Sequence, residues 1–406
     1  MGDLLKFKNM RRISAHLICD GRGKCYSKGI LTLDAEGTIL DIQDTNGILH
    51  ESAEVEFFSG LIVPGFVNAH CHLELSHLQH KFSEGSGFIP FLKKVVENRN
   101  NDPDRIVNAA LRADLLMHKN GIVAVGDISN GITAFDVKRN SKIDYFTFVE
   151  ALGFAPERAE RAFDWAKNCK KIAESLGLKA SIVPHAPYSV SISLFKAIAA
   201  EAGETCLPLS VHSQESTEED ELYQSGTGEI VNHLQDNLAI DTSFFIPTGK
   251  NAIRSTLEML PSQNNLLLVH NLFTNQSDLD YIKSVRKLDN TWFVLCPGSN
   301  LYIQNRLPDV ELFRNNHLQI CLGTDSLVSN HQLSILEEMK IIQAAYPAIP
   351  IDEMITWASF NGAKALGLAD WVGSLEVGKR PGINLITGLD LTEKKLLSGT
   401  KVKKLI

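Results

Sequence analysis

The sequence predicts an α/β protein: a (β/α)8 TIM barrel with a small β-sandwich domain formed by both chain ends. Short apolar runs alternate with helical segments through the middle of the chain. Short strands separated by turn residues occupy both ends, and histidines follow several of the apolar runs. We therefore expect a β-sandwich domain over residues 1–58 plus 371–406, and a metal-dependent barrel domain over residues 59–370.

The two chain ends share a strand-and-turn pattern. Residues 12–58 contain short strands, and Glu36-Gly37 is typical of a hairpin turn between two of them. The same pattern returns after Trp371. The two ends are therefore expected to pair in one sheet.

The middle of the chain contains eight short apolar runs, with helical segments between most of them. Eight strands with intervening helices are the number that a (β/α)8 barrel requires. The runs cover residues 61–67, 121–128, 145–149, 180–183, 207–211, 265–269, 292–295 and 318–322.

Composition narrows the class of partner. The chain has 406 residues, is 44% hydrophobic, and carries a formal net charge of −8 without a block of lysine or arginine. This charge argues against a nucleic-acid groove or an anionic membrane as the main partner, so we expect a small-molecule substrate. No secretion signal and no run of about eighteen apolar residues occurs, and a cytoplasmic protein is expected.

The seven cysteines form no CxxC pair and are odd in number. We expect them to be reduced residues, several of them in the core, with no disulfide framework. They are Cys19, Cys25, Cys71, Cys169, Cys206, Cys296 and Cys321.

A metal site is predicted where the first apolar run ends. His70 and His72 are two residues apart, so in an extended chain their imidazoles share a face while Cys71 points elsewhere. An isolated pair is weak evidence, but His212, His270 and Asp325 also follow apolar runs, the fifth, sixth and eighth. In a barrel these positions meet at the carboxyl-terminal face, where barrel enzymes hold their active sites.

Three imidazoles and one carboxylate favour zinc or ferrous iron over calcium or magnesium. Such an ion lowers the pKa of bound water to about 7. Glu215 lies three residues after His212, close enough to shuttle a proton without binding the ion, and is the candidate general acid and base. The alternative is a solvated glutamate that opens the acidic stretch at residues 218–221.

Several segments together resemble the amidohydrolase superfamily, in particular its branch of aminohydrolases and chlorohydrolases that act on purine, pyrimidine and triazine rings. The resemblance covers nearly the whole chain. The segments are PGFVNAHCHLE from Pro64, VHSQE from Val211, VHN from Val269, CPGSN from Cys296 and GTDSLVSN from Gly323.

This resemblance implies a barrel with a flanking β-sandwich, and it suggests a homodimer. It also implies one divalent ion, zinc or iron, for which the ligands would be His70, His72, His212 and Asp325. Asp325 would also take a proton from the attacking water, and His270 would orient the hydroxide. Glu215 would protonate the ring nitrogen and then the leaving group.

Relatives with two metal ions use a carboxylated lysine at the end of the third or fourth strand. The corresponding segments here, Phe148-Val-Glu-Ala-Leu-Gly and Ile182-Val-Pro-His-Ala-Pro-Tyr, contain no lysine, which favours one metal. His185 lies in a segment similar to one that meets the substrate in this branch. A histidine that faces the core is the alternative for it.

The residues that follow His72 bear on the choice of substrate. If the extended chain continues, Glu74 shares a face with His72 and suits ribose hydroxyls. The segment resembles the aminofutalosine deaminase group, which implies deamination of an adenine nucleoside such as 6-amino-6-deoxyfutalosine. Phe88 and Phe91 could line the pocket that holds the base, or they could be ordinary core residues.

Other reactions stay open. Guanine, S-adenosylhomocysteine and methylthioadenosine deaminases share the metal motifs, and a chlorohydrolase or a hydrolase of an amide bond would use the same attack by hydroxide. Glu215 favours an amine, because chloride leaves without protonation. A non-catalytic scaffold of the same fold is a remote alternative, because such proteins usually lose metal ligands and this chain retains the full set.

Overall fold

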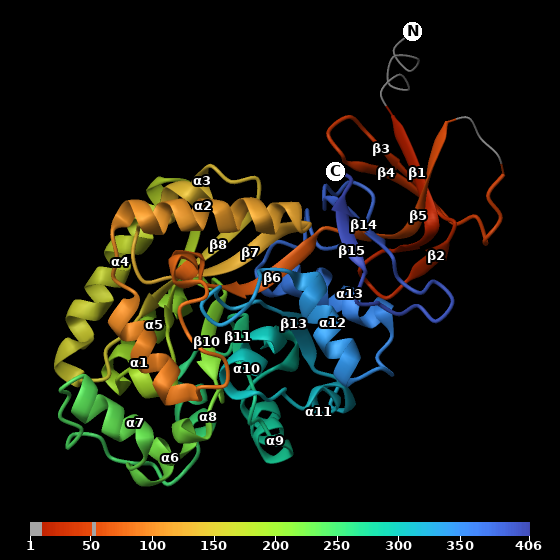
Figure 1. Ribbon diagram of the computed structural model, residues 1–406. Helices are drawn as coiled ribbons and strands as arrows, with labels where there is room; N and C mark the ends of the chain where they lie inside the picture. The colour runs from red at the N-terminus through yellow and green to blue at the C-terminus, as the bar shows by residue number, and fades with distance from the viewer. Residues whose placement is uncertain (1–9, 51–53) are drawn as a thin grey trace. The chain divides into compact units, whose positions relative to one another are not determined.

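The computed structural model describes residues 10–50 and 54–406, which form a mixed α/β protein (Figure 1). The strands are β1 (Arg11–Cys19), β2 (Cys25–Ser27), β3 (Ile30–Leu33), β4 (Ile39–Gln43), β5 (Val55–Pro64), β6 (Phe66–Cys71), β7 (Ile122–Ser129), β8 (Asp144–Ala151), β9 (Lys179–Pro184), β10 (Leu209–Ser213), β11 (Leu266–His270), β12 (Thr291–Leu295), β13 (Gln319–Leu322), β14 (Ile383–Thr387) and β15 (Lys401–Lys404).

The α-helices are α1 (Phe88–Asn98), α2 (Pro103–Lys119), α3 (Phe135–Arg139), α4 (Ala159–Ser175), α5 (Ile192–Thr205), α6 (Thr217–Ser225), α7 (Glu229–Asn232), α8 (Ala252–Thr256), α9 (Gln276–Val285), α10 (Pro297–Gln304), α11 (Val310–Asn315), α12 (Ile335–Ala345), α13 (Ile351–Ala358) and α14 (Phe360–Ala365). Across the described ranges, no helix combines the length and the apolar character needed to cross a lipid bilayer.

The chain divides into two compact units. One contains the described residues up to Asn68 together with residues 115–125 and 334–406. The other contains residues 69–114 and 126–333. All the side chains predicted to bind metal, perform catalysis or contact substrate belong to this second unit.

The first unit contains a seven-stranded sheet in the order β15-β14-β5-β1-β3-β4, with β2 paired to β1. β14, from the C-terminal part of the chain, runs antiparallel to β5, and β5 runs parallel to β1. The prediction that the two chain ends pair in one sheet is therefore confirmed. The hairpin predicted at Glu36-Gly37 is confirmed as well, because β3 and β4 pair antiparallel on either side of it.

The first predicted barrel strand, residues 61–67, is divided between two strands. Its first part ends β5 and pairs with β14, whereas β6 begins after Gly65. A Cβ atom at Gly65 would lie 2.4 Å from Cγ1 of Val123 and 2.5 Å from the carbonyl oxygen of Pro381, so only glycine fits there. The apolar run is continuous in sequence because both strands are buried, which hid the break.

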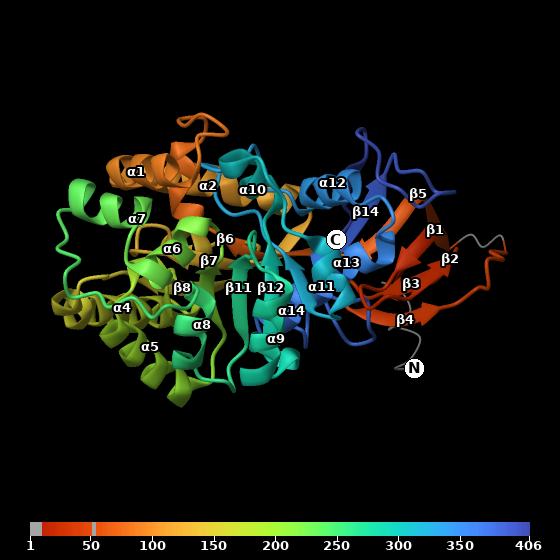
Figure 2. The ribbon, with the colours of Figure 1, turned by 90° about the horizontal axis from the view of Figure 1, so that it is seen from below.

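Two further sheets have four strands each, in the orders β6-β7-β8-β9 and β10-β11-β12-β13. β8 and β9 are parallel, as are the neighbouring strands from β10 to β13. Helix α4 packs against β8 and β9, and α5 packs against β9 (Figure 2). Every residue of β11 and β12 is buried, which explains why these strands appear in the sequence as unbroken apolar runs.

Hydrogen bonds also join the ends of these two sheets. The amide of His212, in β10, donates to the carbonyl oxygen of His185, which follows β9, at 2.9 Å. The amides of Thr324 and Asp325, which follow β13, donate to the carbonyl oxygen of His70 in β6 at 3.0 and 3.1 Å. The residues that follow β9 and β13 are thus hydrogen-bonded to strands of the other sheet.

The prediction that all seven cysteines are reduced was wrong for two of them. Cys19 and Cys25 form a disulfide. They are directly opposite each other where β1 and β2 pair antiparallel, so a tight connection between strands brings the two sulfur atoms together. Of the remaining five, Cys206 is exposed and the others are buried.

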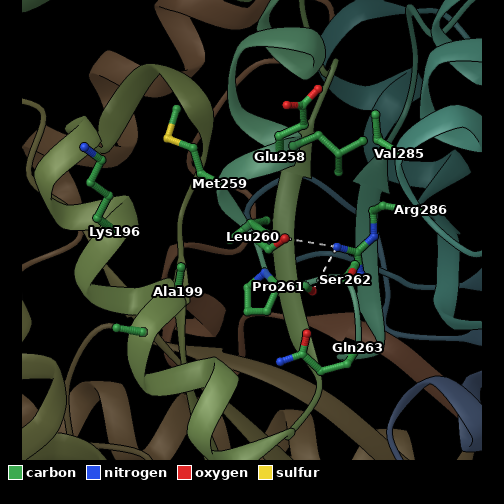
Figure 3. A pocket seen from close by; sticks show the side chains of 12 residues that line it. Lys196, Ala199, Glu258, Met259, Leu260, Pro261, Ser262, Gln263, Val285 and Arg286 are labelled. Atoms are coloured by element: carbon green, nitrogen blue, oxygen red, sulfur yellow. Dashed lines mark hydrogen bonds between the residues drawn. The ribbon is translucent and has the colours of Figure 1, made fainter.

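A pocket of about 870 Å³ lies among α5, residues 257–263 and the residues at the end of α9 (Figure 3). Its guanidinium group, from Arg286, donates to the carbonyl oxygens of Leu260 and Pro261 at 3.4 and 3.0 Å, and also to that of Asn264 at 3.0 Å. The arginine therefore secures the segment that leads into β11. None of the predicted site residues lines this pocket.

Candidate metal centre and active site

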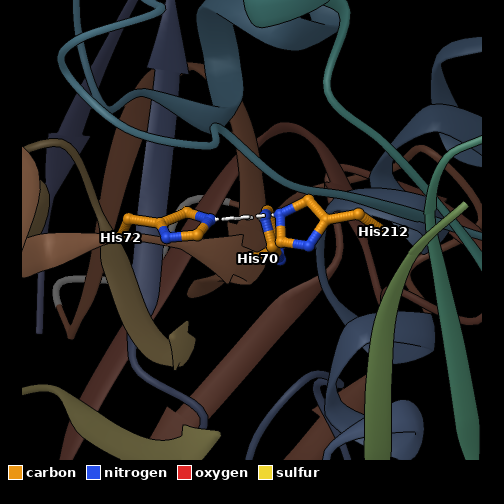
Figure 4. Close-up of side chains that lie close together, drawn as sticks. All are labelled: His70, His72 and His212. Carbon is orange, nitrogen blue, oxygen red and sulfur yellow. Dashed lines mark hydrogen bonds between the residues drawn. The ribbon is translucent and has the colours of Figure 1, made fainter. Parts of the chain in front are cut away.

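Three buried histidines turn their ring nitrogens toward one another (Figure 4). Nε2 of His72 lies 3.1 Å from Nε2 of His70 and 3.3 Å from Nε2 of His212. Tetrahedral zinc with Zn–N bonds of roughly 2.0–2.1 Å keeps its nitrogen ligands about 3.3 Å apart. The spacing of these nitrogens therefore fits a shared metal ion.

His212 has a defined tautomer. Its Nδ1 lies 2.9 Å from the carbonyl oxygen of His185, which can only accept a hydrogen bond. A neutral imidazole carries one N–H, so this contact leaves a lone pair on Nε2, directed at the other two histidines. That is the form in which an imidazole binds a metal ion.

Asp325 completes the ring of candidate ligands. Its Oδ1 lies 3.4 Å from Nε2 of His72 and 3.7 Å from Nε2 of His70. Its Oδ2 accepts hydrogen bonds from the hydroxyls of Ser299 and Ser329, at 2.7 and 2.5 Å. The two serines therefore hold the carboxylate so that its other oxygen faces the histidines.

The protonation states of these groups suit a cation. Burial lowers the pKa of His72 to about 3, although Asp325 opposes this shift, and burial and the neighbouring histidines hold the pKa of His70 well below its usual range. Burial alone would raise the pKa of Asp325, but His72, His270 and the two serine hydroxyls lower it to about 2. Neutral imidazoles and an ionised carboxylate are the forms that bind metal.

Glu215 is buried beside this cluster, so the alternative of a solvated glutamate was wrong. Its Oε1 lies 3.7 Å from Nε2 of His270, and its backbone N–H donates to Oε1 of Glu219 at 3.0 Å. Burial raises the pKa of the Glu215 carboxyl well above its usual range, and the negative charges of Asp325 and Glu219 add to this rise. These surroundings therefore favour the protonated form of the carboxyl group.

His270 stacks on His212, with ring centroids 5.4 Å apart and an interplanar angle of 24°. Its Nδ1 lies 3.3 Å from Nδ2 of Asn300, which belongs to the same segment as Ser299. The other ring nitrogen faces Glu215. His270 thus lies between the candidate acid and the metal cluster.

Left-handed backbone conformations occur at three strand ends in this site. The φ angles are 49° at Gln214, 75° at His270 and 54° at Asp325. Non-glycine residues in such conformations cost about 1–3 kcal/mol each and gather at functional sites, where surrounding structure enforces them. The strain here redirects the chain at the point where each strand delivers a site residue.

His185 contacts the cluster from the end of β9. Its ring centroid lies 4.8 Å from that of His212, and its Nδ1 lies 2.6 Å from Oγ of Ser189. Burial lowers its pKa to about 3. The structure therefore brings His185 together with the predicted ligands.

Glu74 does not follow the extended path that we expected. A 3₁₀ helix, η2 (Leu73–Leu78), begins directly after His72 and carries Glu74. Its Oε1 accepts the backbone N–H of Asn130 at 3.1 Å and lies 3.6 Å from Nη2 of Arg99. Burial raises the pKa of Glu74 to about 7, although Arg99 opposes this shift.

The Glu74 side chain lines a mostly polar cavity of about 290 Å³. The other lining residues are Leu75, Arg99, Asn100, Ile106, Asn130, Gly131 and Thr133. Phe88 and Phe91 do not line this cavity. Phe88 packs edge-to-face on Tyr188 at 5.6 Å, and Phe91 packs on Phe82 at 6.0 Å, each inside an apolar cluster.

Sequence reasoning missed three side chains that support the cluster: Ser299, Ser329 and Glu150. Both serines lie in motifs that carried the family resemblance, but nothing in a motif tells which atom a hydroxyl contacts. Glu150, near the end of β8, has Oε1 3.6 Å from Nδ1 of His212, and its Oε2 accepts from Nδ2 of Asn130 at 2.8 Å. Its position at a strand end was the available signal.

Glu150, His185 and His212 form a second group of side chains with metal-binding atoms, and this group shares His212 with the first. Nδ1 of His212 faces Glu150 but contacts the His185 carbonyl oxygen, as described above. Glu150 therefore lies on the side of His212 that faces away from the other two imidazoles.

The chain is similar to a family of known proteins. The model of the Amidohydrolase family matches residues 61–404. An adenosine deaminase of Helicobacter pylori is 30% identical over 338 residues, which cover 82% of this chain and 80% of the relative. An aminodeoxyfutalosine deaminase of Nitratiruptor sp. is 27% identical over 407 residues, covering 97% and 95%.

A solved structure has the same fold. The crystal structure of Helicobacter pylori aminofutalosine deaminase in complex with methylthio-coformycin superposes with a TM-score of 0.80. The alignment covers 98% of this chain and 100% of that chain at 24% identity.

Removal of either serine hydroxyl should weaken metal binding. In Ser299→Ala and Ser329→Ala, the carboxylate of Asp325 loses one hydrogen-bond donor, so its pKa should rise and its orientation should loosen. Loss of such a supporting contact typically lowers metal affinity about 10–100-fold. Competition between apoprotein and a chelator for zinc measures the effect.

Ser284→Ala is the matched control, because this exposed hydroxyl contacts only the carbonyl oxygen of Tyr281 within α9. Zinc affinities of the two site variants equal to that of the control would show that the serines do not support Asp325.

Proposed function

Because the chain belongs to the amidohydrolase family, we propose that it is a metal-dependent hydrolase that removes the amino group of an adenine nucleoside and releases ammonia. The observation that carries the proposal is the placement of two buried carboxyl groups around one histidine cluster: Asp325 lies beside His70 and His72, and Glu215 lies 3.7 Å from Nε2 of His270. The deaminases of H. pylori and Nitratiruptor, related over four fifths or more of the chain, support the adenine nucleoside.

For the fold, we propose that β6 to β13 close into a (β/α)8 barrel and that the chain ends form a β-sandwich. The hydrogen bonds from His212 to His185 and from Asp325 to His70 support closure at both junctions of the two sheets. We keep residues 59–370 as the proposed barrel domain and residues 1–58 plus 371–406 as the proposed sandwich domain.

For the cofactor, we propose one divalent ion, zinc or alternatively iron. His70, His72, His212 and Asp325 would hold it, as the spacing of their nitrogen and oxygen atoms supports. When bound, such an ion would lower the pKa of water and supply hydroxide at neutral pH. The carboxyl-terminal ends of β8 and β9 carry no lysine that could bridge a second ion.

Metal analysis of the purified protein should therefore give one tightly bound equivalent per chain. Removal by a chelator should abolish activity, and zinc should restore it. Two tightly bound equivalents would contradict the proposed single site.

The side chains divide the proton transfers between them. Water adds to the ring carbon that bears the amino group, and Asp325 accepts the proton that the water loses. Glu215 donates its proton to the adjacent ring nitrogen. Ionised Glu215 then takes the proton of the adduct's hydroxyl group and passes it to the amino group. The C–N bond breaks, ammonia leaves as the carbonyl forms, and the proton held by Asp325 returns to Glu215. His270, between Glu215 and the histidine cluster, donates a hydrogen bond that orients the attacking oxygen.

We propose that Glu74 accepts hydrogen bonds from the ribose hydroxyls and that His185 contacts the base. The cavity beside Glu74 supports this arrangement, because its walls provide both donors and acceptors. We also propose that Phe88 contacts the substrate, although its ring packs on Tyr188. 6-Amino-6-deoxyfutalosine is the proposed substrate, with adenosine, S-adenosylhomocysteine, methylthioadenosine and guanine as alternatives.

A chlorohydrolase and a non-catalytic scaffold are less well supported. A chloride leaving group needs no acid, whereas burial and neighbouring negative charges raise the pKa of Glu215 and so favour a proton donor there. A scaffold has no need for three converging imidazoles.

We also propose that the protein is cytoplasmic and that it forms a homodimer.

Ammonia release by zinc-loaded protein tests the reaction and the substrate together. The substrates would be 6-amino-6-deoxyfutalosine, adenosine, S-adenosylhomocysteine and methylthioadenosine, with guanine and cytosine as controls. We expect rapid release from at least one adenine nucleoside and none from cytosine. No release from any adenine nucleoside by fully metallated protein would refute the proposed reaction.

Glu215→Gln should nearly abolish ammonia release, because the amide cannot donate and recover a proton. General acid–base catalysis contributes about 10²–10⁴-fold, so kcat should fall by at least the lower figure. Metal content should be unchanged. Glu221→Gln, at an exposed position of α6, is the control that removes a carboxylate outside the site. Unchanged turnover in Glu215→Gln would eliminate the assigned role.

A further inference from the structure

A buried ion pair lies next to the metal cluster but contributes no ligand to it. Asp127 is in β7 and Lys138 is in α3, and both side chains are completely buried. Nζ of Lys138 lies 2.5 Å from Oδ2 of Asp127 and donates to the hydroxyls of Ser129 and Thr147 at 2.8 and 3.3 Å. The ammonium group of Lys138 is thus paired and hydrogen-bonded within the protein.

The other oxygen of Asp127 contacts the backbone directly after a candidate ligand. Its Oδ1 accepts the N–H of Leu73 at 2.7 Å. Leu73 is the first residue of η2, and the preceding residue, His72, has no side-chain hydrogen bond that caps the helix. The first N–H groups of a helix lack partners within it, so Asp127 supplies one from a neighbouring strand.

This contact lies where the chain changes direction. The backbone of His72 has φ −121° and ψ 81°, between the extended conformation of β6 and the turn of η2. The orientation of the His72 ring depends on where this change occurs. A fixed Leu73 N–H therefore limits the positions that Nε2 of His72 can reach.

We propose that Asp127 and Lys138 are positioning residues for the metal centre: Asp127 fixes the turn that aims His72, and Lys138 pairs with Asp127 and holds its orientation. The inference rests on the proposed metal site. A carboxylate buried without a positive partner costs several kcal/mol and tends to become protonated. Lys138 offsets this cost and contacts one oxygen, which leaves the other for Leu73.

The alternative is that the ion pair only stabilises the fold. Two double variants separate these roles, because both remove the ion pair and both leave the site neutral. Asp127→Asn with Lys138→Met keeps a carbonyl oxygen that can accept the Leu73 N–H. Asp127→Leu with Lys138→Met has a side chain of similar size but no acceptor.

Zinc affinity of the apoproteins is measured by chelator competition, together with their thermal unfolding. We expect Asp127→Leu/Lys138→Met to bind zinc at least about 10-fold more weakly than Asp127→Asn/Lys138→Met, as for other supporting contacts of metal ligands. Equal zinc affinities in the two variants would overturn the proposal, whatever their unfolding temperatures.

Lys170→Met with Glu201→Gln is a matched control, since this largely buried pair joins α4 to α5 and contacts no ligand. It should change the unfolding temperature but leave zinc affinity within about twofold of the wild-type value.

A second measurement does not depend on the variants folding. The Leu73 amide of the wild-type apoprotein should exchange its hydrogen slowly, and exchange as fast as that of exposed amides would also overturn the proposal. Failure of the wild-type protein itself to bind zinc would refute the metal centre, a result distinct from equal binding by the two double variants.

Discussion

Three buried imidazoles converge in this structure, and Nε2 of His72 lies within hydrogen-bond distance of Nε2 of both His70 and His212. This arrangement restricts the groups around it. Each neutral ring has one N–H, and His212 uses its own for the carbonyl oxygen of His185. The remaining lone pair gains little from other imidazoles, whereas a cation would satisfy several such lone pairs at once. The neighbouring carboxylate of Asp325 supplies the negative charge that a divalent ion requires.

The two carboxyl groups nearest this centre are held in opposite states by their surroundings. Asp325 accepts two hydroxyl hydrogen bonds and lies beside two imidazoles, all of which favour its ionised form. Glu215 has two negatively charged neighbours and is buried, so the protonated form is favoured. Pairs of titratable groups with separated pKa values are the usual basis of acid and base roles in one site. Here the separation arises from imidazoles and hydroxyl donors around Asp325, and from burial beside negative charges at Glu215.

The backbone conformation at the strand ends brings the functional side chains together at the histidine cluster. Left-handed conformations at Gln214, His270 and Asp325 turn the chain at the ends of three strands, and η2 turns it after His72. Such turns are costly unless neighbouring hydrogen bonds enforce them. The contact of Asp127 with the Leu73 amide, the serines on Asp325 and Glu219 on the Glu215 amide all perform this task. Gln214, His270 and Asp325 are thus strained positions that present a functional side chain or directly precede one.

Much of the fold and the site follows from periodicity and local spacing in the sequence. Runs such as residues 265–269 and 292–295 are apolar because strands buried on both faces must be, and His70 and His72 share a face because they lie in or beside a strand. The break at Gly65, the disulfide between Cys19 and Cys25 and the helix at Glu74 escaped prediction. Each depends on which distant strand or amide lies opposite. The sequence by itself determined which histidines and carboxylates lie at or after the ends of strands, because apolar runs and the residues that follow them are local properties. Only the tertiary structure decided which groups Ser299, Ser329, Glu150 and Asp127 contact, because hydrogen bonds between residues far apart in sequence have no local signal.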